Sequence, residues 1–277
     1  MFKFNFDIDE NSKRECSNEK QDDVNVSNQE FGCFYLNDLR NEDAENGRNK
    51  FDFYTSDLVP NVYEGGFKTW ECSHDLVGYL KSIVSNFQET TTVIELGCGS
   101  GLPGLELNKH RRFHVDFQDF NREVVEQTGK QLKSKEENYN NRMFFGDWGD
   151  LVNVIPSKHY DIILTSETIY NIGNYRKLVQ LFDHCLTAQG LIYDIILTSE
   201  TIYNIGNYRK LVQLFDHCLT AQGLIYLAAK VYYFGVQGGV RQFEEFINKT
   251  GLFNTRVVRV IDANVKREIL EIKRSNC

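Results

Sequence analysis

Beyond about residue 58, short apolar runs alternate with longer segments in which apolar residues recur at helical spacing. The runs predict buried strands, and the segments between them predict amphipathic helices. Strands are predicted over residues 92–96, 113–119, 142–148 and 160–166, and helices after Ser73 (as N-cap), from Pro103 and over 123–132. Alternating units of one strand and one helix favour a parallel sheet with helices on both faces.

The C-terminal part has a different pattern. Two apolar-rich runs, 252–262 and 266–274, are separated by Ala263 and Asn264 without a helical segment between them. Such a pair predicts an antiparallel hairpin. With a fifth strand over 223–230, the pattern predicts an α/β fold, a doubly wound and mostly parallel seven-stranded sheet that ends in this hairpin.

One segment of the chain occurs twice. Residues 160–192 (copy one), 33 in all, recur at 193–225 (copy two) without a single change. A repeat architecture needs several copies and usually shows divergence between them, so this pair indicates a recent duplication or a sequence-assembly error. Because closing a loop of this size costs only a few kcal/mol, we expect the surplus to be expelled at a surface connection. Expulsion there preserves the entry from Pro156 into the strand at Tyr160, so we expect copy one to supply the fourth strand.

Two other outcomes are open for the duplicated segment. Copy two can replace copy one in the sheet, or both copies can enter a widened sheet. We expect the widened sheet least, because the C-terminal hairpin must still reach the fifth strand. An expelled copy would expose an apolar strand and helix face, so the surplus should lower stability and favour aggregation.

Residues 1–58 differ in composition from the predicted domain over 59–277. They hold 14 acidic and 7 basic side chains, a net charge of −7 against −8 for the whole chain. Alternation of Phe and Ile with polar residues over 2–8 predicts a strand that docks on the domain, and 9–50 has the composition of a poorly ordered linker. This charge distribution does not favour direct nucleic-acid binding, which needs clustered Lys and Arg.

Composition narrows the class of protein. The apolar fraction of 41% and the charged fraction of 25% are ordinary for a globular protein, and 277 residues can bury a large core. Neither a membrane-spanning run nor a secretory signal is apparent. Seven cysteines without a C-x-x-C pair argue against a disulfide framework and a structural metal site. We therefore expect a protein of the cytoplasm or nucleus that holds no metal.

The strongest chemical signal is the motif V-I-E-L-G-C-G-S-G-L-P-G. Gly97, Gly99 and Gly101 form a turn between a strand and a helix, where glycine lets the backbone approach a ligand. The G-x-G-x-x-G spacing that ends at Gly104 would also suit a dinucleotide. Two observations favour S-adenosylmethionine instead. Glu95 lies two residues before the first glycine, where it can serve the methionine part of that cofactor, and the chain ends in the C-terminal hairpin.

Two further carboxylates follow the next strands. Asp119 lies at the end of the second strand, where a doubly wound fold places an acceptor for ribose hydroxyls. Gly146, Asp147 and Trp148 end the third strand, so a carboxylate and an indole lie where the adenine ring would be. The alternatives are a helix N-cap for Asp119 and a solvated turn carboxylate for Asp147.

These motifs resemble those of the protein-histidine methyltransferases, within the seven-β-strand (class I, Rossmann-like) methyltransferases that use S-adenosylmethionine. The resemblance runs from about residue 58 to the end and includes the F-x-F-x-F start. It rests on V-Y-E-G-G-F-K-T-W-E-C-S-H-D-L, the glycine motif, Q-D-F-N, G-D-W, L-T-S-E-T-I-Y-N and A-K-V-Y-Y-F-G-V-Q-G-G-V. It implies that the substrate is a large-subunit ribosomal protein. By similarity, the cofactor is held by Thr69, Trp70, Glu71, Cys72, Ser73, Gly97, Asp119, Phe120, Asn121, Gly146, Asp147, Trp148 and Ser166 or its duplicate Ser199.

Methyl transfer to imidazole makes modest chemical demands, because imidazole is mostly neutral and nucleophilic at pH 7. An acceptor that fixes the tautomer and stabilises the forming imidazolium would help. The L-T-S-E-T-I-Y-N motif follows its strand at the edge where ligands bind in such folds. It supplies as candidates Glu167, Tyr170 and Asn171, or the duplicates Glu200, Tyr203 and Asn204.

The sequence alone leaves two other functions open. A lysine-directed or small-molecule methyltransferase would keep every cofactor motif and change only the acceptor pocket. A non-catalytic binding protein, inactivated by the duplication, is the alternative from a different class.

Overall fold

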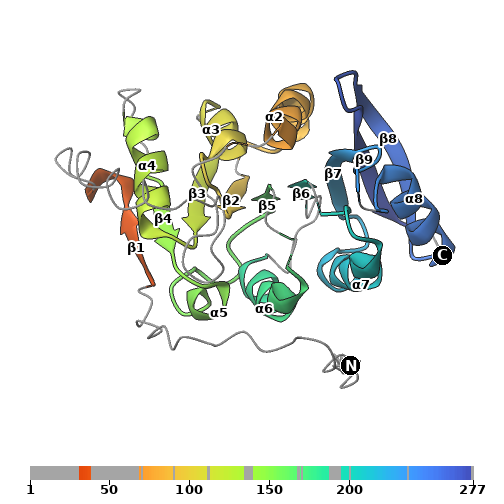
Figure 1. The fold of residues 1–277 in the computed structure, drawn as a ribbon. Helices are drawn as coiled ribbons and strands as arrows, with labels where there is room; N and C mark the ends of the chain where they lie inside the picture. Colours follow the sequence, from red (N-terminus) through yellow and green to blue (C-terminus); the bar gives the residue numbers. More distant parts are fainter. Residues whose placement is uncertain are drawn as a thin grey trace, which may run out of the picture.

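The computed structural model describes residues 31–38, 69, 71–89, 91–110, 113–133, 140–166, 169, 171–186, 195–199, 201–235 and 237–275. Within these ranges the chain forms one mixed sheet with helices on both faces (Figure 1). Its nine strands are β1 (Gly32–Tyr35), β2 (Thr92–Leu96), β3 (His114–Asp119), β4 (Arg142–Phe145), β5 (Ile162–Thr165), β6 (Ile195–Ser199), β7 (Leu224–Lys230), β8 (Phe253–Ile261) and β9 (Arg267–Arg274). They lie in the order β1-β4-β3-β2-β5-β6-β7-β9-β8.

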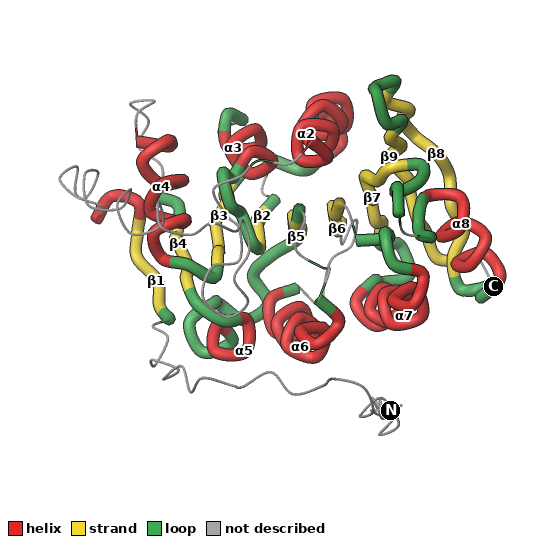
Figure 2. Tube along the Cα trace, in the orientation of Figure 1, coloured by secondary structure: helices red, strands yellow, loops and turns green. Residues whose placement is uncertain are grey.

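The helices form two layers, one on each face of the sheet. They are α2 (Glu71–Ile83), α3 (Leu102–Asn108), α4 (Arg122–Lys133), α5 (Trp148–Leu151), α6 (Tyr175–Cys185), α7 (Tyr208–Cys218) and α8 (Val240–Lys249), with 3-10 turns η2 (Leu36–Asp38), η4 (Val84–Asn86), η5 (Ile172–Asn174) and η6 (Ile205–Asn207). Helices α2 to α4 cover one face and α5 to α8 the other (Figures 1 and 2), each over its own buried apolar cluster. None of the described helices has the length and apolar character needed to cross a membrane.

The predicted fold class is confirmed. Strands β2, β3, β4, β5 and β7 form where the apolar runs predict them, in parallel ladders. Strands β8 and β9 pair antiparallel, with Phe253 opposite Arg274 and Ile261 opposite Arg267. The strand order turns around at β2, with β3 and β4 on one side and β5 and the later strands on the other. The carboxyl end of β2 is therefore the place where a doubly wound sheet binds ligands.

The prediction that one copy of the duplicated segment is expelled is wrong. Copy one forms β5 and α6, copy two forms β6 and α7, and β6 lies between β5 and β7. Ile162 is opposite Ile195 in the first of these two parallel ladders, and Ile195 is opposite Leu224 in the second. The centre of the sheet thus contains one strand more than expected, and α6 and α7 pack side by side on the same face (Figure 2).

Insertion is favoured because each copy is a complete strand–helix unit. Such a unit returns the chain to the same edge of the sheet, one position further along. Residues of both helices, such as Phe182 and Phe215, then share one buried cluster. Expulsion would expose these side chains at about 1.5–3 kcal/mol each. The hairpin still reaches β7, with Leu224 opposite Lys273, because the later strands shift together.

Residues 1–58 contribute a described strand that the sequence analysis did not predict. Strand β1 pairs antiparallel with β4, with Gly32 opposite Phe145, and so interrupts the expected linker over 9–50. Phe34 packs on Phe145, with ring centroids 6.3 Å apart. An edge strand needs one partner and one apolar face, so these few residues suffice in a polar segment. The predicted strand over 2–8 and the domain boundary near 58 lie outside the described residues.

Candidate active site

The carboxyl end of β2 leads into a turn built from glycines. Gly97, Gly99 and Gly101 have φ values of 59°, 51° and 67°, in the left-handed region that other residues disfavour. A Cβ on Gly101 would lie 2.6 Å from Thr128 Cγ2. The Thr128 hydroxyl also donates to Gly99 O at 2.7 Å. The predicted turn is therefore confirmed, and its backbone conformation explains the glycines.

Glu95, two residues before the turn, is buried against the start of α3. Its Oε2 accepts a hydrogen bond from Gly104 N at 2.7 Å, and a Cβ on Gly104 would lie only 2.5 Å from that oxygen. Burial raises the pKa of Glu95 to about 8; the bond from Gly104 N opposes this rise and the charge of Asp119 adds to it. The carboxyl group is therefore mostly protonated at neutral pH and supports the turn. A direct contact with a cofactor stays a prediction.

Asp119 ends β3 beside the glycine turn. Its Oδ2 accepts from Gly99 N at 2.9 Å, and its Oδ1 accepts from Asn121 N at 3.3 Å. Helix α4 begins at Arg122, so Asp119 lies too far upstream to be its N-cap. The carboxylate is thus held where the sequence predicts the ribose acceptor, followed by Phe120 and the buried Asn121.

Gln118, which the sequence analysis did not select, connects the two turns that follow β2 and β4. Its Oε1 accepts from Gly97 N at 3.2 Å and from Trp148 Nε1 at 3.0 Å. Its Nε2 donates to Gly146 O at 3.1 Å. The side chain is fully buried. The sequence signal that could have identified it is an amide within a strand that the flanking helices bury, because a buried polar group needs partners.

Asp147 is both a helix cap and an ion-pair residue, rather than a solvated turn carboxylate. Its Oδ1 accepts from Gly149 N at 2.8 Å, at the start of α5. Its Oδ2 lies 2.6 Å from Nζ of Lys177 on α6 of copy one. A contact with the exocyclic amine of adenine stays a prediction, and it would have to share Oδ2 with Lys177.

Copy one contacts helix α2 through a pair of hydroxyls. Ser73 was predicted to be an N-cap, but α2 begins at Glu71, so Ser73 lies inside the helix. Its Oγ is 2.6 Å from Ser166 Oγ at the end of β5, and the neighbouring Cys72 is fully buried. Ser73 and Ser166 are both predicted cofactor residues, and Ser166 is the one that copy one supplies.

Residues at and just before the start of this helix contact the glycine turn and the hairpin. Thr69 Oγ1 donates to Ser100 Oγ at 2.8 Å, within the turn. Glu71 forms an ion pair with Arg267 of β9, with Oε2 and Nη1 3.0 Å apart. Trp70 lies outside the described residues. Thr69 is therefore next to the candidate site, and Glu71 is engaged with the hairpin.

Two of the predicted catalytic residues cap short helices. Asn171 Oδ1 accepts from Gly173 N, and Asn204 Oδ1 accepts from Gly206 N, each at 2.9 Å. The two asparagines are equivalent positions of the two copies and make the same bond at η5 and η6. Each amide oxygen thus has a structural partner, and the structure of these two asparagines is explained without a role in the reaction.

Tyr203, the next candidate, lies against a loop that follows β7. Its carbonyl oxygen accepts from Gly238 N at 3.1 Å, and its ring centroid is 6.3 Å from that of Tyr233. The remaining candidates, namely Glu167, Tyr170, Glu200 and the side chain of Ser199, lie outside what the structure describes, so their roles stay predictions.

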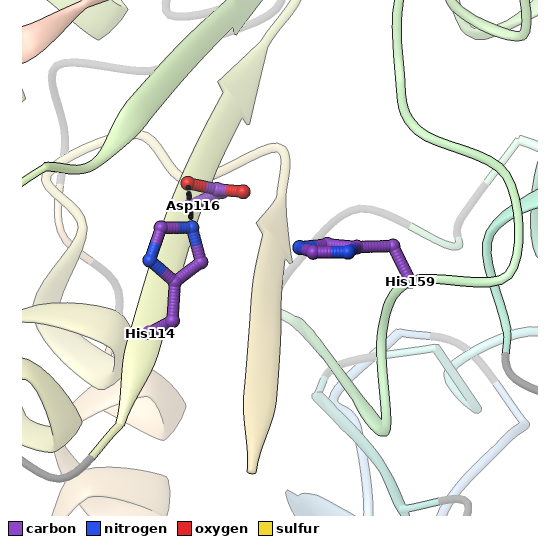
Figure 3. Close-up of side chains that lie close together, drawn as sticks. All are labelled: His114, Asp116 and His159. Atoms are coloured by element: carbon purple, nitrogen blue, oxygen red, sulfur yellow. Dashed lines mark ion pairs between the residues drawn. The ribbon is translucent and has the colours of Figure 1, made fainter. Parts of the chain in front are cut away.

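A separate cluster of possible metal ligands lies at the opposite edge of the sheet (Figure 3). Ligand atoms of His114, Asp116 and His159 are within 4.8 Å of one another, at the start of β3. Asp116 Oδ2, however, lies 2.7 Å from Arg142 Nη2 and accepts from Tyr160 OH at 2.6 Å. Burial alone would raise the pKa of Asp116, but His114 and Arg142 hold it below the ordinary value. A divalent cation would share this carboxylate with a guanidinium, so we interpret the cluster as an ion-pair network.

Comparison with known proteins agrees with the motifs at the glycine edge. A profile of the family described as lysine methyltransferase matches residues 61–193. Proteins named histidine protein methyltransferase 1 homolog, from Rattus norvegicus and Dictyostelium discoideum, are 34% identical to this chain over 246 and 226 residues. The chain is a relative of the histidine protein methyltransferases. The resemblance predicted from the motifs is thereby confirmed.

The alignments cover most of this chain but only part of its relatives. They cover 78% of this chain and 59% and 60% of the two relatives, so the chain spans about three fifths of the length of the histidine protein methyltransferases that it matches. The family profile ends at Tyr193, the first residue of copy two. Among solved structures, a magnesium protoporphyrin IX methyltransferase from Synechocystis PCC 6803 with bound SAH aligns over 86% of this chain and 99% of its own, with 12% identity and a TM-score of 0.45.

Proposed function

We propose that this chain transfers the methyl group of S-adenosylmethionine to a histidine side chain of another protein. The observation that carries the proposal is a left-handed glycine turn held by Asp119 in a chain 34% identical to proteins named for this activity. The turn provides a binding edge, and the relatives indicate the class of acceptor.

The residues at this edge suit S-adenosylmethionine. The three glycines of the turn, Gly97, Gly99 and Gly101, carry no side chains that would keep a ligand away from the backbone. Asp119 is fixed next to the turn, where a carboxylate accepts from ribose hydroxyls in such folds. When bound, the cofactor supplies an electrophilic methyl group. The chain's own residues have to hold the acceptor in line with it.

In-line displacement depends on position more than on acid–base chemistry. A neutral imidazole already carries the attacking lone pair, so no strong base is needed before attack. Gln118 and Glu95 hold the turn rigid from within the core. We propose that Glu167 or its duplicate Glu200 accepts the imidazole N–H and stabilises the imidazolium as it forms.

We further propose that the acceptor is a large-subunit ribosomal protein and that the chain acts in the cytoplasm or nucleus. This part rests on the resemblance in W-E-C-S and Y-F-G-V-Q-G-G. The acidic residues of 1–58, with a net charge of −7, would attract a basic ribosomal protein. Transfer to lysine is the second candidate, favoured by the description of the matching family profile.

The test is to identify the residue that receives the methyl group. The full chain is incubated with methyl-labelled S-adenosylmethionine and large ribosomal subunits, and the labelled protein is hydrolysed for amino-acid analysis. Methylhistidine is expected. Methyl-lysine as the sole product would favour the second candidate, and no label despite bound cofactor would favour a non-catalytic binding protein. Asp119→Ala should weaken cofactor binding by about 1–3 kcal/mol in calorimetry.

A further inference from the structure

The two copies have the same sequence but make different polar contacts, although α2 also packs against β6 of copy two. Copy one faces the elements that precede it. Ser166 contacts Ser73 of α2, Lys177 pairs with Asp147 at the start of α5, and β5 pairs with β2. Every one of these partners belongs to the edge that carries the glycine turn.

Copy two contacts the elements that follow it, through the described residues 231–235 and 237–239 of the connection after β7 (the 231–239 loop). The Tyr203 carbonyl accepts from Gly238 N, and a Cβ on Gly238 would lie 2.2 Å from that carbonyl oxygen. The Tyr208 hydroxyl accepts from Gly239 N at 3.0 Å. The equivalent hydroxyl in copy one, that of Tyr175, makes its described hydrogen bond to Ile169 O in its own copy.

The 231–239 loop is itself suited to bind a protein segment. It follows the carboxyl end of β7, on the ligand-binding edge of the sheet. Tyr232 and Phe234 are 47% and 75% exposed, with ring centroids 4.9 Å apart and nearly perpendicular rings. Exposed aromatic side chains of this kind are enriched where proteins bind one another. Nothing lies within 4 Å of a Cβ built on Gly235, so there is open space at that position of the loop.

We infer that the duplication has divided one active site into two halves. The cofactor half is held by copy one, and the half that binds the histidine-bearing segment of the acceptor, the 231–239 loop, is held by copy two. This inference rests on the proposed function. Because the sequences are identical, a single copy could make both sets of contacts, with its strand between β2 and β7.

The spacing of strands gives the size of the displacement. Neighbouring strands lie about 4.8 Å apart, so β6 moves the 231–239 loop that much further from β2. Methyl transfer requires the reacting atoms to lie about 3–3.5 Å apart, and a misplacement of about 1 Å can reduce the rate about a hundredfold. The duplicated chain should therefore bind S-adenosylmethionine normally and transfer its methyl group slowly.

The experiment compares the full chain with a variant that lacks residues 193–225. Removing copy one instead yields the same sequence, so one variant tests both cases. Cofactor affinity is measured by calorimetry, and methyl transfer with labelled S-adenosylmethionine and large ribosomal subunits. We expect the two proteins to bind S-adenosylmethionine with affinities that agree within about threefold. We expect the deletion variant to transfer the methyl group at least about tenfold faster, because a misplacement of reactants of about 1 Å can cost about a hundredfold in rate.

The outcomes separate this inference from the proposed function. Equal rates of histidine methylation by both proteins would overturn the division of the site and leave the function in place. No histidine methylation by either protein, with the cofactor bound, would overturn the function and the inference with it.

A second variant tests the acceptor half by itself. Phe234→Ala in the deletion variant should raise the KM for ribosomal subunits at least about fivefold, the effect of losing about 1 kcal/mol of contact. Cofactor affinity should not change. The control is Val260→Ala on β8, an apolar residue that is 52% exposed and lies on the hairpin. If Phe234→Ala and Val260→Ala have the same KM, the 231–239 loop does not bind the acceptor.

Discussion

Copy one and copy two fold alike and are held differently. Each forms a strand, a 3-10 turn and a helix of the same length, with an asparagine cap at the same place. The surroundings differ: Asp183 of copy one pairs with His217, whereas the equivalent Asp216 pairs with Arg274 of β9. Local structure therefore follows from the repeated sequence, while the role of each residue is decided by its neighbours.

The largest effect is expected on the copy-one side, at Glu95 of β2, which lies opposite Leu164 of β5. Its pKa is about 8 in the folded protein, against 4.5 as the ordinary value. The folded state therefore binds a proton that the unfolded state releases, and stability falls as the pH rises from about 4.5 to 8, by up to about 1.4 kcal/mol per pH unit. Glu95→Gln should be more stable relative to wild type at pH 8 than at pH 5, by about 3 kcal/mol in urea unfolding. A pH-independent difference would contradict the buried, protonated state.

The next effect is expected on the copy-two side, at Gly238. A Cβ there would lie 2.2 Å from Tyr203 O and 2.4 Å from Ile202 O, so backbone has to move. Gly238→Ala should lower the free energy of unfolding by about 2–3 kcal/mol, the scale of overpacking. Gly235→Ala is the control in the same loop; it meets no atom and should cost only about 1 kcal/mol for its positive φ. Equal losses would mean that copy two does not press against the 231–239 loop.

The buried tyrosines give a matched pair between the copies. The Tyr208 hydroxyl lies 2.9 Å from Ile202 O and accepts from Gly239 N, whereas Tyr175 donates to Ile169 O at 3.1 Å. Tyr208→Phe should cost about 1–3 kcal/mol because it leaves a buried amide without its acceptor. Tyr175→Phe should cost about 1 kcal/mol. Chemical unfolding of the two variants measures the difference, and a reversed order would be incompatible with the observed contacts.

The smallest effect is expected for the two aspartates. Asp216 has a guanidinium partner with Oδ1 and Nη1 2.6 Å apart, and Asp183 has an imidazole partner at 2.9 Å and is more exposed. Asp216→Asn should cost about 0.5–1 kcal/mol and Asp183→Asn less than about 0.5 kcal/mol, both decreasing with added salt. Thermal unfolding at low and high ionic strength is the measurement. Losses that are equal at low salt would show that the hairpin does not distinguish the copies.

The parts of the fold that sequence could predict are those with strong local signals. The apolar runs identify β2, β3, β4 and β5, and the hairpin follows from two runs without a helix between them. Strand β1 escaped prediction because four residues in a polar segment gain their order from pairing with β4. The placement of the copies also escaped, because identical sequences contain no information about which unit the sheet accepts. That choice depends on whether the later strands can shift together.

The candidate site also combines features that the sequence could predict with features that it could not. Glycine spacing and the position of Asp119 after a strand were sufficient to predict the turn and its carboxylate. Three side chains were not recognised for what they do, because their partners are distant in the sequence. Gln118 bridges two turns, Lys177 pairs with Asp147, and Ser73 contacts Ser166 from inside a helix. Such contacts become visible only once the sheet brings the strand ends together.

The most direct test of the difference between the copies is the effect of one serine on cofactor affinity. Ser166 of copy one is held 2.6 Å from Ser73, and Ser199 is its equivalent one strand further from β2. Calorimetry with S-adenosylmethionine should show that Ser166→Ala weakens binding about fivefold, the loss of one hydrogen-bonded contact, while Ser199→Ala binds as tightly as the wild type. Loss of affinity in Ser199→Ala with Ser166→Ala unaffected would contradict the assignment of the cofactor half to copy one.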